Sequence, residues 1–256
     1  MNDEQLMIVG RNMVHDALLS EKNIQVIYIG KNSRNDPRIK EILKLAQGKN
    51  VNVSFVHAEK IRAISGSENT QNIVAYMQNY KGNSLKEILE RKSKEGKDPF
   101  VLLFNHMDYE QNLGAIIRSS WGAQVDAIVL SPSGVHEVTP VVAKVSQGGA
   151  AFVPVISQSL FQAIEVLREY NIPLVGVEVG MGKPYDELTL LGPVAFLLGG
   201  EDVGISEPLQ RKCDIFIHIP INSELASLNI SVATALVMFE KRRQERALTV
   251  GEGNEA

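Results

Sequence analysis

Two short polar segments carry residue types suited to ligand binding and catalysis, and each lies just beyond an apolar run. Gly199–Glu201 directly follows the apolar run Val194–Leu198, and Ser227–Asn229 lies a few residues beyond the apolar run Ile215–Ile219. Apolar runs of this length are typical of buried strands, and open α/β sheets bind ligands at the carboxyl ends of their strands. Glycines let a ligand approach the backbone, and a polar segment that opens a helix offers unpaired N–H groups. Both segments are therefore predicted to line a ligand site.

A third segment, Asn112–Ser119, lies earlier in the chain and carries polar residues at its two ends. Asn112 and Arg118 are six residues apart at a predicted transition from loop to helix. An Asn side chain can donate to and accept from a ribose hydroxyl, and the fork of an Arg side chain binds phosphate. The two residues therefore predict contact with a nucleotide. The alternative is that Arg118 is an ordinary surface arginine of a helix.

Taken in chain order, the segments at Asn112, Gly199 and Ser227 lie within residues 100–246 and resemble the three motifs of the SpoU family of RNA 2′-O-ribose methyltransferases, within the SPOUT superfamily. The resemblance implies an enzyme that transfers a methyl group from S-adenosylmethionine to a ribose hydroxyl of RNA. Ribosomal RNA is favoured over transfer RNA as the substrate. A non-catalytic RNA-binding or ribosome-assembly factor on the same scaffold is the alternative, which the retention of all the polar motif residues disfavours.

The resemblance also implies roles for individual residues. The catalytic residues that it implies are Asn112, Arg118, Glu201, Ser227 and Asn229, and the cofactor-binding residues are Gly199, Gly200, Ile219 and Leu228. A guanidinium stays protonated in proteins and is a poor base, so Arg118 is predicted to position phosphate and stabilise oxyanion charge, with the proton acceptor left open. Glu201 is predicted to anchor the Asn112 loop or the substrate, with a purely structural role as the alternative. For Asn229 the alternative is a helix cap, since Asn favours that position.

Length and charge distribution predict a two-domain RNA-binding protein. A chain of 256 residues exceeds the usual size of one domain. We predict a substrate-binding domain at 1–80, a linker at 81–98, a methyltransferase domain at 99–247 and a flexible tail at 248–256. Residues 1–98 hold 16 Lys and Arg against 12 Asp and Glu, a net charge of +4, whereas residues 99–256 hold 10 against 18, a net charge of −8. The basic front third is predicted to contact RNA; the alternative is an ordinary solvated Lys-rich surface.

Alternating strand-like and helical segments predict the fold class. Apolar runs predict strands at Ile24–Ile29, Val51–Val56, Ile73–Met77, Phe100–Phe104, Ala127–Leu130, Phe152–Val155, Pro173–Val177, Val194–Leu198 and Ile215–Ile219. Helices are predicted at Val9–Ser20, Pro37–Gln47, Gly114–Gly122, Leu160–Tyr170 and Leu228–Arg246, with a short helix in the linker. Strands that alternate with helices indicate an α/β fold with a parallel sheet covered on both faces. The family resemblance adds a small ribosomal-protein-like N-terminal domain, a deep C-terminal trefoil knot and a homodimer.

Further features narrow the class of protein. No apolar run approaches the ~20 residues of a membrane-spanning helix, and the acidic N-terminus lacks the layout of a secretory signal. The one cysteine, Cys213, is predicted to be a buried packing thiol, in keeping with the reducing cytoplasm. The five histidines have no ligand spacing, so no catalytic metal is predicted. Val232, Leu236 and Phe239 share one stripe of the last helix, which predicts either a dimer interface or core packing.

Overall fold

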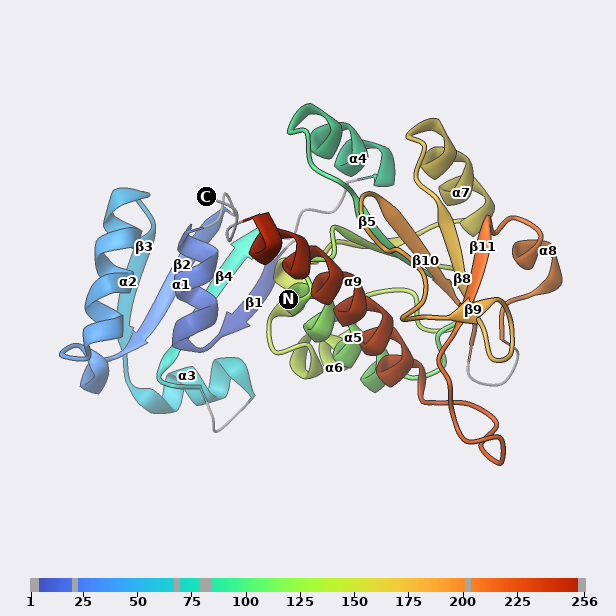
Figure 1. Cartoon of the computed structure of the whole chain (residues 1–256). Coiled ribbons are helices and arrows are strands. Elements are labelled where there is room, and N and C mark those ends of the chain that lie inside the picture. Colours follow the sequence, from blue (N-terminus) through green and yellow to red (C-terminus); the bar gives the residue numbers. More distant parts are fainter. Residues whose placement is uncertain (1–4, 20–22, 67–69, 79–83, 201–203, 253–256) are drawn as a thin grey trace. The chain divides into compact units, whose positions relative to one another are not determined.

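The computed structural model describes residues 5–19, 23–66, 70–78, 84–200 and 204–252. The chain divides into two compact units, Met1–Gly82 and Asn83–Ala256 (Figure 1). Each unit is built around its own β-sheet. Across the described ranges, no helix combines the length and the apolar character needed to cross a membrane.

Unit 1 is a four-stranded sheet in the order β1-β4-β2-β3 with helices packed on it. Its elements are β1 (Gln5–Val9), α1 (Arg11–Leu19), β2 (Ile24–Gly30), the 3₁₀ helix η1 (Lys31–Ser33), α2 (Pro37–Gly48), β3 (Asn52–Val56), α3 (Ala58–Ser65) and β4 (Ile73–Gln78). β4 runs antiparallel to β1 and β2, whereas β2 and β3 are parallel. The carboxyl ends of β1, β2 and β3 therefore share one edge of the sheet. β1 and α3 were not predicted from the sequence.

Unit 2 contains a seven-stranded sheet in the order β7-β6-β5-β10-β8-β11-β9. The strands are β5 (Phe100–Phe104), β6 (Ala127–Leu130), β7 (Val155–Ser157), β8 (Leu174–Val177), β9 (Lys183–Pro184), β10 (Val194–Leu198) and β11 (Ile215–His218). Every pairing is parallel. The chain moves outward from β5 to β7 and then returns to the other side of β5, and this reversal is where such sheets bind ligands.

Helices cover both faces of this sheet, as predicted (Figure 1). They are α4 (Leu85–Lys94), α5 (Glu110–Gly122), α6 (Pro140–Val145), α7 (Leu160–Glu169), α8 (Glu207–Gln210) and α9 (Ile230–Glu252), with the 3₁₀ helix η2 (Gly149–Ala151). Side chains of α5, α6 and α9 share one apolar cluster with Phe100, Leu102 and Phe104. Side chains of α4, α7 and α8 share the other with Val101 and Leu103. Because both faces are buried, the strands are continuous apolar runs.

In unit 2, α6, α8 and β9 were not predicted, and three predicted segments differ from the structure. The short helix predicted in the linker is present as α4, but its apolar side chains belong to the core of unit 2. The predicted strand Phe152–Val155 begins only at Val155, because Gly149–Ala151 forms a 3₁₀ helix and Phe152 stacks on Trp121, with ring centroids 4.5 Å apart. The last helix continues to Glu252, into the predicted tail. The trefoil knot stays a prediction from the family resemblance.

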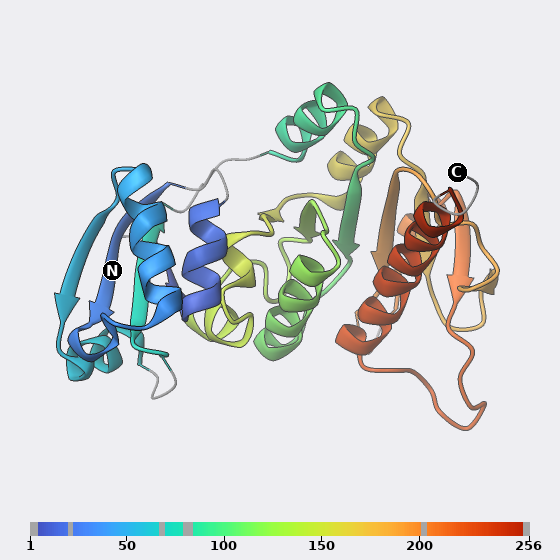
Figure 2. The same ribbon diagram turned by 60° about the vertical axis from the view of Figure 1, so that its left-hand side comes forward.

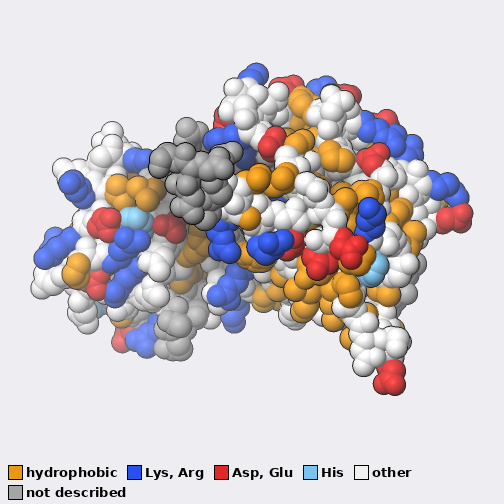
Figure 3. Space-filling view, in the orientation of Figure 1, with side chains coloured by type: hydrophobic (Ala, Val, Ile, Leu, Met, Phe, Trp, Pro, Cys, Tyr) orange, Lys and Arg blue, Asp and Glu red, His pale blue; other side chains and the backbone are white. Residues whose placement is uncertain are grey.

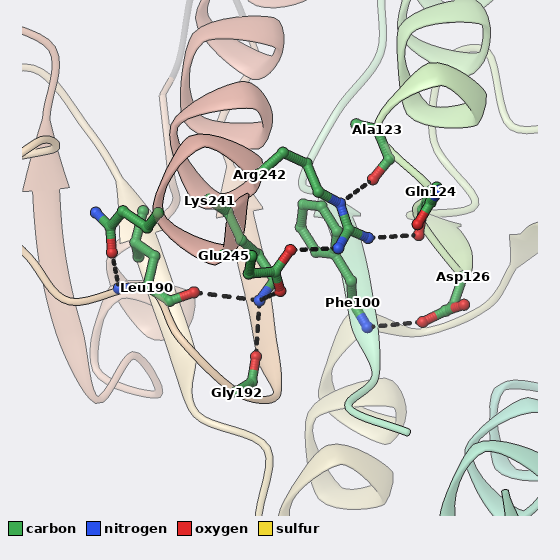
Figure 4. Close-up of polar contacts among 10 residues, drawn as sticks. Phe100, Ala123, Gln124, Asp126, Leu190, Gly192, Lys241, Arg242 and Glu245 are labelled. Carbon is green, nitrogen blue, oxygen red and sulfur yellow. Dashed lines mark hydrogen bonds and ion pairs between the residues drawn. The ribbon is translucent and has the colours of Figure 1, made fainter. Parts of the chain in front are cut away.

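Helix α9 is fixed to the segment before β10 by a buried lysine (Figure 4). The side chain of Lys241 is 1% exposed and donates to the carbonyl oxygens of Leu190 at 3.1 Å and Gly192 at 2.7 Å. It also donates to Glu245 Oε1 at 2.7 Å. All three donors of the ammonium group are therefore used, which a buried charge requires.

Arg242 extends the same attachment to the end of α5 (Figure 4). Its guanidinium donates to the carbonyl oxygens of Ala123 and Gln124 and pairs with Glu245. It also lies 5.3 Å from the centre of the Phe100 ring. Consecutive residues of α9 thus hold two separate segments of unit 2.

Candidate active site

A cavity of about 540 Å³ opens at the carboxyl ends of β8, β10 and β11. The residues that line it are Val177, Glu178, Val179, Leu198, Gly199, Gly200, Gly204, Ile205, Gln210, Ile219, Ile221, Ala226, Ser227, Leu228, Ile230 and Ala233. Figure 2 shows the long loop between β11 and α9, which contains the lining residues Ala226, Ser227 and Leu228. Five residues predicted from the sequence meet here: Gly199, Gly200, Ile219, Ser227 and Leu228.

The glycine after β10 is required by close packing of backbone on backbone. A Cβ atom on Gly199 would lie 2.0 Å from the carbonyl carbon of Gly204, a distance that real structures do not allow. Gly204 also donates its N–H to the Gly200 carbonyl at 3.0 Å, which closes the loop. The sequence explained Gly199 by the approach of a ligand, whereas the structure assigns its lack of a side chain to the shape of the loop itself.

The polar segment before α9 is joined to the start of α5. Asn229 Nδ2 donates to Asn112 Oδ1 at 3.1 Å. Asn229 Oδ1 accepts from the Ser231 N–H at 2.9 Å, so the side chain caps α9, which begins at Ile230. Asn229 lies between Leu228 and Ile230, which both line the cavity. Capping and a position beside the cavity are thus combined in one residue.

The structure does not add the remaining two predicted residues, Arg118 and Glu201, to this geometry. Arg118 is exposed on α5, and in the described parts of the chain it forms no hydrogen bond or ion pair. It is not among the residues that line the cavity. Glu201 lies outside the described residues.

Glu178 was missed by the sequence analysis, although it lines the cavity. It follows β8, and its Oε2 accepts from the Ile205 N–H at 2.8 Å. It therefore holds the chain just beyond the β10 loop. The sequence signal was an acidic residue at the end of an apolar run, but its meaning depends on β8 lying next to β10.

A chain of polar contacts around His106 was also missed. His106 Nε2 lies 3.0 Å from Asp108 Oδ1, and its Nδ1 lies 3.2 Å from Ser133 Oγ, which is 3.0 Å from Ser131 Oγ. A Cβ on Gly200 would lie 3.1 Å from the His106 Cβ, so this network adjoins the cavity loop. Its members come from the loops after β5 and β6, far apart in sequence. Within the described ranges, no three His, Cys, Asp or Glu side chains are grouped to hold a metal ion.

Cys213 is half-buried, and its Sγ lies 3.5 Å from the Leu209 carbonyl oxygen. Burial, with the nearby charge of Asp214, raises the pKa of this thiol to about 12. A thiol in this environment stays protonated and is a weak nucleophile. The predicted packing role fits this environment.

Fold and site together define an α/β protein with a cavity at the carboxyl edge of a parallel sheet. Residues 99–239 match the SpoU rRNA Methylase family, and residues 7–82 match the domain described as RNA 2′-O ribose methyltransferase substrate binding. The chain therefore belongs to the SpoU rRNA methylase family.

A protein of Staphylococcus saprophyticus named for the TrmH family of tRNA/rRNA methyltransferases is 31% identical over 94% of this chain and 96% of its own. A Bacillus subtilis protein named for the same family is 25% identical over 98% of this chain and 100% of its own.

Solved structures share the fold along nearly the whole chain. The AdoMet-bound rRNA methyltransferase of Sinorhizobium meliloti superposes with a TM-score of 0.72 at 22% identity, covering 94% of this chain and 87% of its own. The SpoU methyltransferase AviRb of Streptomyces viridochromogenes, in complex with AdoMet, has a TM-score of 0.73 at 17% identity over 95% and 92%. At these identities the likeness concerns the fold.

Proposed function

We propose that this protein is an S-adenosylmethionine-dependent RNA 2′-O-ribose methyltransferase that acts on ribosomal RNA in the cytoplasm. The observation that carries the proposal is the cavity itself, where the Gly199 loop, Ile219 and the Ser227–Leu228 segment meet. Relatives are named for both tRNA and rRNA methylation, so transfer RNA is the alternative substrate.

The residues around the cavity fit the proposed cofactor. Apolar side chains of Leu198, Ile219 and Leu228 offer walls for a flat adenine ring, and the backbone of the Gly199 loop offers polar groups. The Glu178 carboxylate supplies an acceptor for a hydroxyl or an ammonium group. The volume lies within the range of small-molecule sites.

For methyl transfer, the protein needs mainly to place the ribose hydroxyl against the methyl group and to stabilise the charge that develops on the 2′ oxygen. When bound, S-adenosylmethionine supplies a methyl group already activated on a sulfonium sulfur. Arg118 is assigned to the phosphate of the target nucleotide and to the charge that develops on its 2′ oxygen. The Asn112–Asn229 hydrogen bond holds the start of α5 against the start of α9. Glu201 and Ser227 are assigned to positioning the ribose.

A homodimer through α9 forms part of the same proposal. Val232, Leu236 and Phe239 are 48%, 37% and 49% exposed, so core packing within one chain does not account for this stripe. Together with Ala115 of α5 and Tyr185 they line a second cavity, also of about 540 Å³. Figure 3 shows apolar side chains gathered over the region of α9 and α5. An exposed apolar patch of this kind is typical of a protein interface.

Calorimetry tests the cofactor assignment. One S-adenosylmethionine or S-adenosylhomocysteine site per chain is expected, because the lining loops form one cavity. Mass spectrometry of nucleosides from unmodified ribosomal and transfer RNA incubated with the protein then identifies a 2′-O-methylated nucleoside and its RNA. Binding of neither ligand, with or without RNA, contradicts the enzyme proposal.

A further inference from the structure

The carboxyl ends of β2 and β3 in unit 1 carry a group of basic side chains. These residues, called here the basic cluster, are Lys31, Arg34, His57 and Lys60. Gly30 pairs with Val56 at the last position of the two parallel strands. Lys31 and His57, the residues that directly follow this pair, therefore lie next to each other, and Lys31 Nζ is 3.3 Å from His57 Nε2. Two nitrogen groups thus converge at one point of the surface.

Aromatic rings position the other two members of the basic cluster. The guanidinium of Arg34 lies 4.6 Å from the centre of the Phe55 ring. The ammonium of Lys60 lies 6.0 Å from the centre of the Tyr28 ring. A cation over a ring face is oriented by the ring, yet it keeps its N–H donors for other partners. All four side chains of the basic cluster are on exposed residues.

Two neighbouring cations of unit 1 are paired with carboxylates, whereas those of the basic cluster are not. Arg11 pairs with Asp36, and Arg38 pairs with Glu41. Asp36 is further engaged by the N–H groups at the start of α2. In the part of the chain that the structure describes, Lys31, Arg34 and Lys60 form no ion pair with a carboxylate. The edge of the sheet therefore presents three cations that pair with none of the described carboxylates.

We infer that the basic cluster binds the phosphodiester backbone of the substrate RNA. The inference rests on the proposed function, and it assigns the contact to one edge of unit 1. Residues 7–82 match a substrate-binding domain, and a backbone of phosphates is the partner whose charge complements this edge. Backbone contacts of this kind position an RNA without reading its sequence. Base recognition is left to other surfaces.

The test compares two matched double variants of the full-length protein. Lys31→Gln/Lys60→Gln removes two charges from the basic cluster. Lys40→Gln/Lys44→Gln removes two charges from exposed residues of α2. Affinity for a labelled mixed-sequence RNA of about 20 nucleotides is measured by fluorescence anisotropy over a range of salt concentrations. Methylation of unmodified ribosomal RNA and calorimetry with S-adenosylmethionine complete the comparison.

The cluster variant is expected to bind RNA roughly tenfold more weakly near physiological salt. The slope of the logarithm of affinity against the logarithm of salt concentration should be shallower by about 1.4, because each phosphate contact on a single strand contributes about 0.7 to that slope. The KM for ribosomal RNA rises, whereas kcat at saturating RNA and cofactor affinity stay unchanged. The α2 variant keeps wild-type affinity and slope. Arg34→Gln alone reduces the slope by about half as much.

Two outcomes overturn the inference. Equal losses in both double variants mean that RNA responds only to the overall charge of the unit. Unchanged affinity and slope in the cluster variant mean that RNA binds elsewhere and that this edge has another partner. Failure of the proposed function has a separate signature, since the wild-type protein would then bind no cofactor and methylate no RNA.

Discussion

Arg118 has an exposed side chain, and in the described parts of the chain it has no hydrogen-bond partner, which suits a residue that acts on an incoming substrate. If it stabilises charge on the 2′ oxygen, Arg118→Ala lowers kcat by about 10²–10³-fold, the usual effect of removing one oxyanion donor. Affinity for S-adenosylmethionine stays nearly unchanged, because Arg118 does not line the cavity. Single-turnover methyl transfer and calorimetry measure the two quantities.

Arg118→Lys serves as the matched comparison. Lysine keeps the positive charge but loses the planar fork. A largely inactive Lys variant indicates bidentate placement of phosphate and hydroxyl, whereas a largely active one indicates simple charge. Near-normal methyl transfer by Arg118→Ala would show that the assigned role is wrong and that Asn112 or Glu201 carries the step.

At the same scale, sequence motifs located five of the sixteen residues that line the cavity, but not the structural reason for each. Ser227, Leu228 and Ile219 were predicted together because each lies beyond a recognisable apolar run. Glu178 could not be predicted, because its hydrogen bond to the Ile205 N–H depends on the order of strands in the sheet. Gly199 was predicted for one reason and is explained by another, since its neighbour is the Gly204 backbone.

At the scale of helices and strands, the attachment of α9 to the rest of unit 2 depends on Lys241, whose side chain is 1% exposed and fully hydrogen-bonded. Lys241→Met leaves the carbonyl groups of Leu190 and Gly192 and the Glu245 carboxylate without their donor. Breaking a buried pair by removing one partner costs about 3–5 kcal/mol. The free energy of unfolding in urea is therefore expected to fall by about that amount.

Lys97→Met is the control for this variant. Lys97 pairs with Glu95, but both side chains are exposed, at 64% and 40%. An exposed ion pair contributes about 0–1 kcal/mol. Equal unfolding free energies for the Lys241 and Lys97 variants would contradict a stabilising role of the buried attachment.

The acidic residues of α9 predict the pH dependence of its stability. The hydrogen bond from Arg243 lowers the pKa of Glu240. For Glu245, burial alone would raise the pKa, but the hydrogen bonds and charges of Lys241 and Arg242 together outweigh it and lower the pKa. A carboxyl whose folded pKa lies below the unfolded value stabilises the fold above the unfolded pKa, and this contribution is lost as the pH falls through the folded pKa.

Stability should therefore decline as the pH falls below about 4.5, the ordinary value of both carboxyls. Urea unfolding of the wild type and of Glu240→Gln over a series of pH values measures the effect. The difference in unfolding free energy between the two proteins should shrink toward low pH, because the wild-type carboxylate becomes protonated there. A difference that is constant with pH would mean that Glu240 gains nothing from its charge.

Helices and strands were predicted best where a single short segment of the sequence is enough to recognise them. β5, β6 and β10 have the predicted bounds, because strands buried on both faces are uninterrupted apolar runs. β7 was displaced since the apolar residue Phe152 packs against Trp121 instead of entering the sheet. α8 has four residues and β9 has two, too few for any periodic pattern.

For the whole molecule, the charge division drawn at residue 98 does not coincide with the boundary between the two units at Gly82, but the units do have different surfaces. Unit 1 presents the basic cluster, whereas unit 2 presents an apolar stripe on α9. The sequence allowed core packing as an explanation of that stripe, because periodicity alone does not say which side of a helix faces solvent. Only the observed packing of α9 against α5 separates its buried face from its exposed one.

The exposed stripe predicts the oligomeric state. If α9 forms the dimer interface, Phe239→Glu places a charge where an apolar contact between two chains is proposed, and the protein is expected to sediment as a monomer at micromolar concentration. Phe161→Glu is the matched control, because Phe161 on α7 is 45% exposed, close to the 49% of Phe239, but does not line the second cavity. The control should stay dimeric. Both variants should keep the wild-type circular dichroism spectrum, since neither side chain is buried within the chain. A wild-type protein that sediments as a monomer, or a Phe239→Glu protein that stays dimeric, would place the contact between chains elsewhere or remove it.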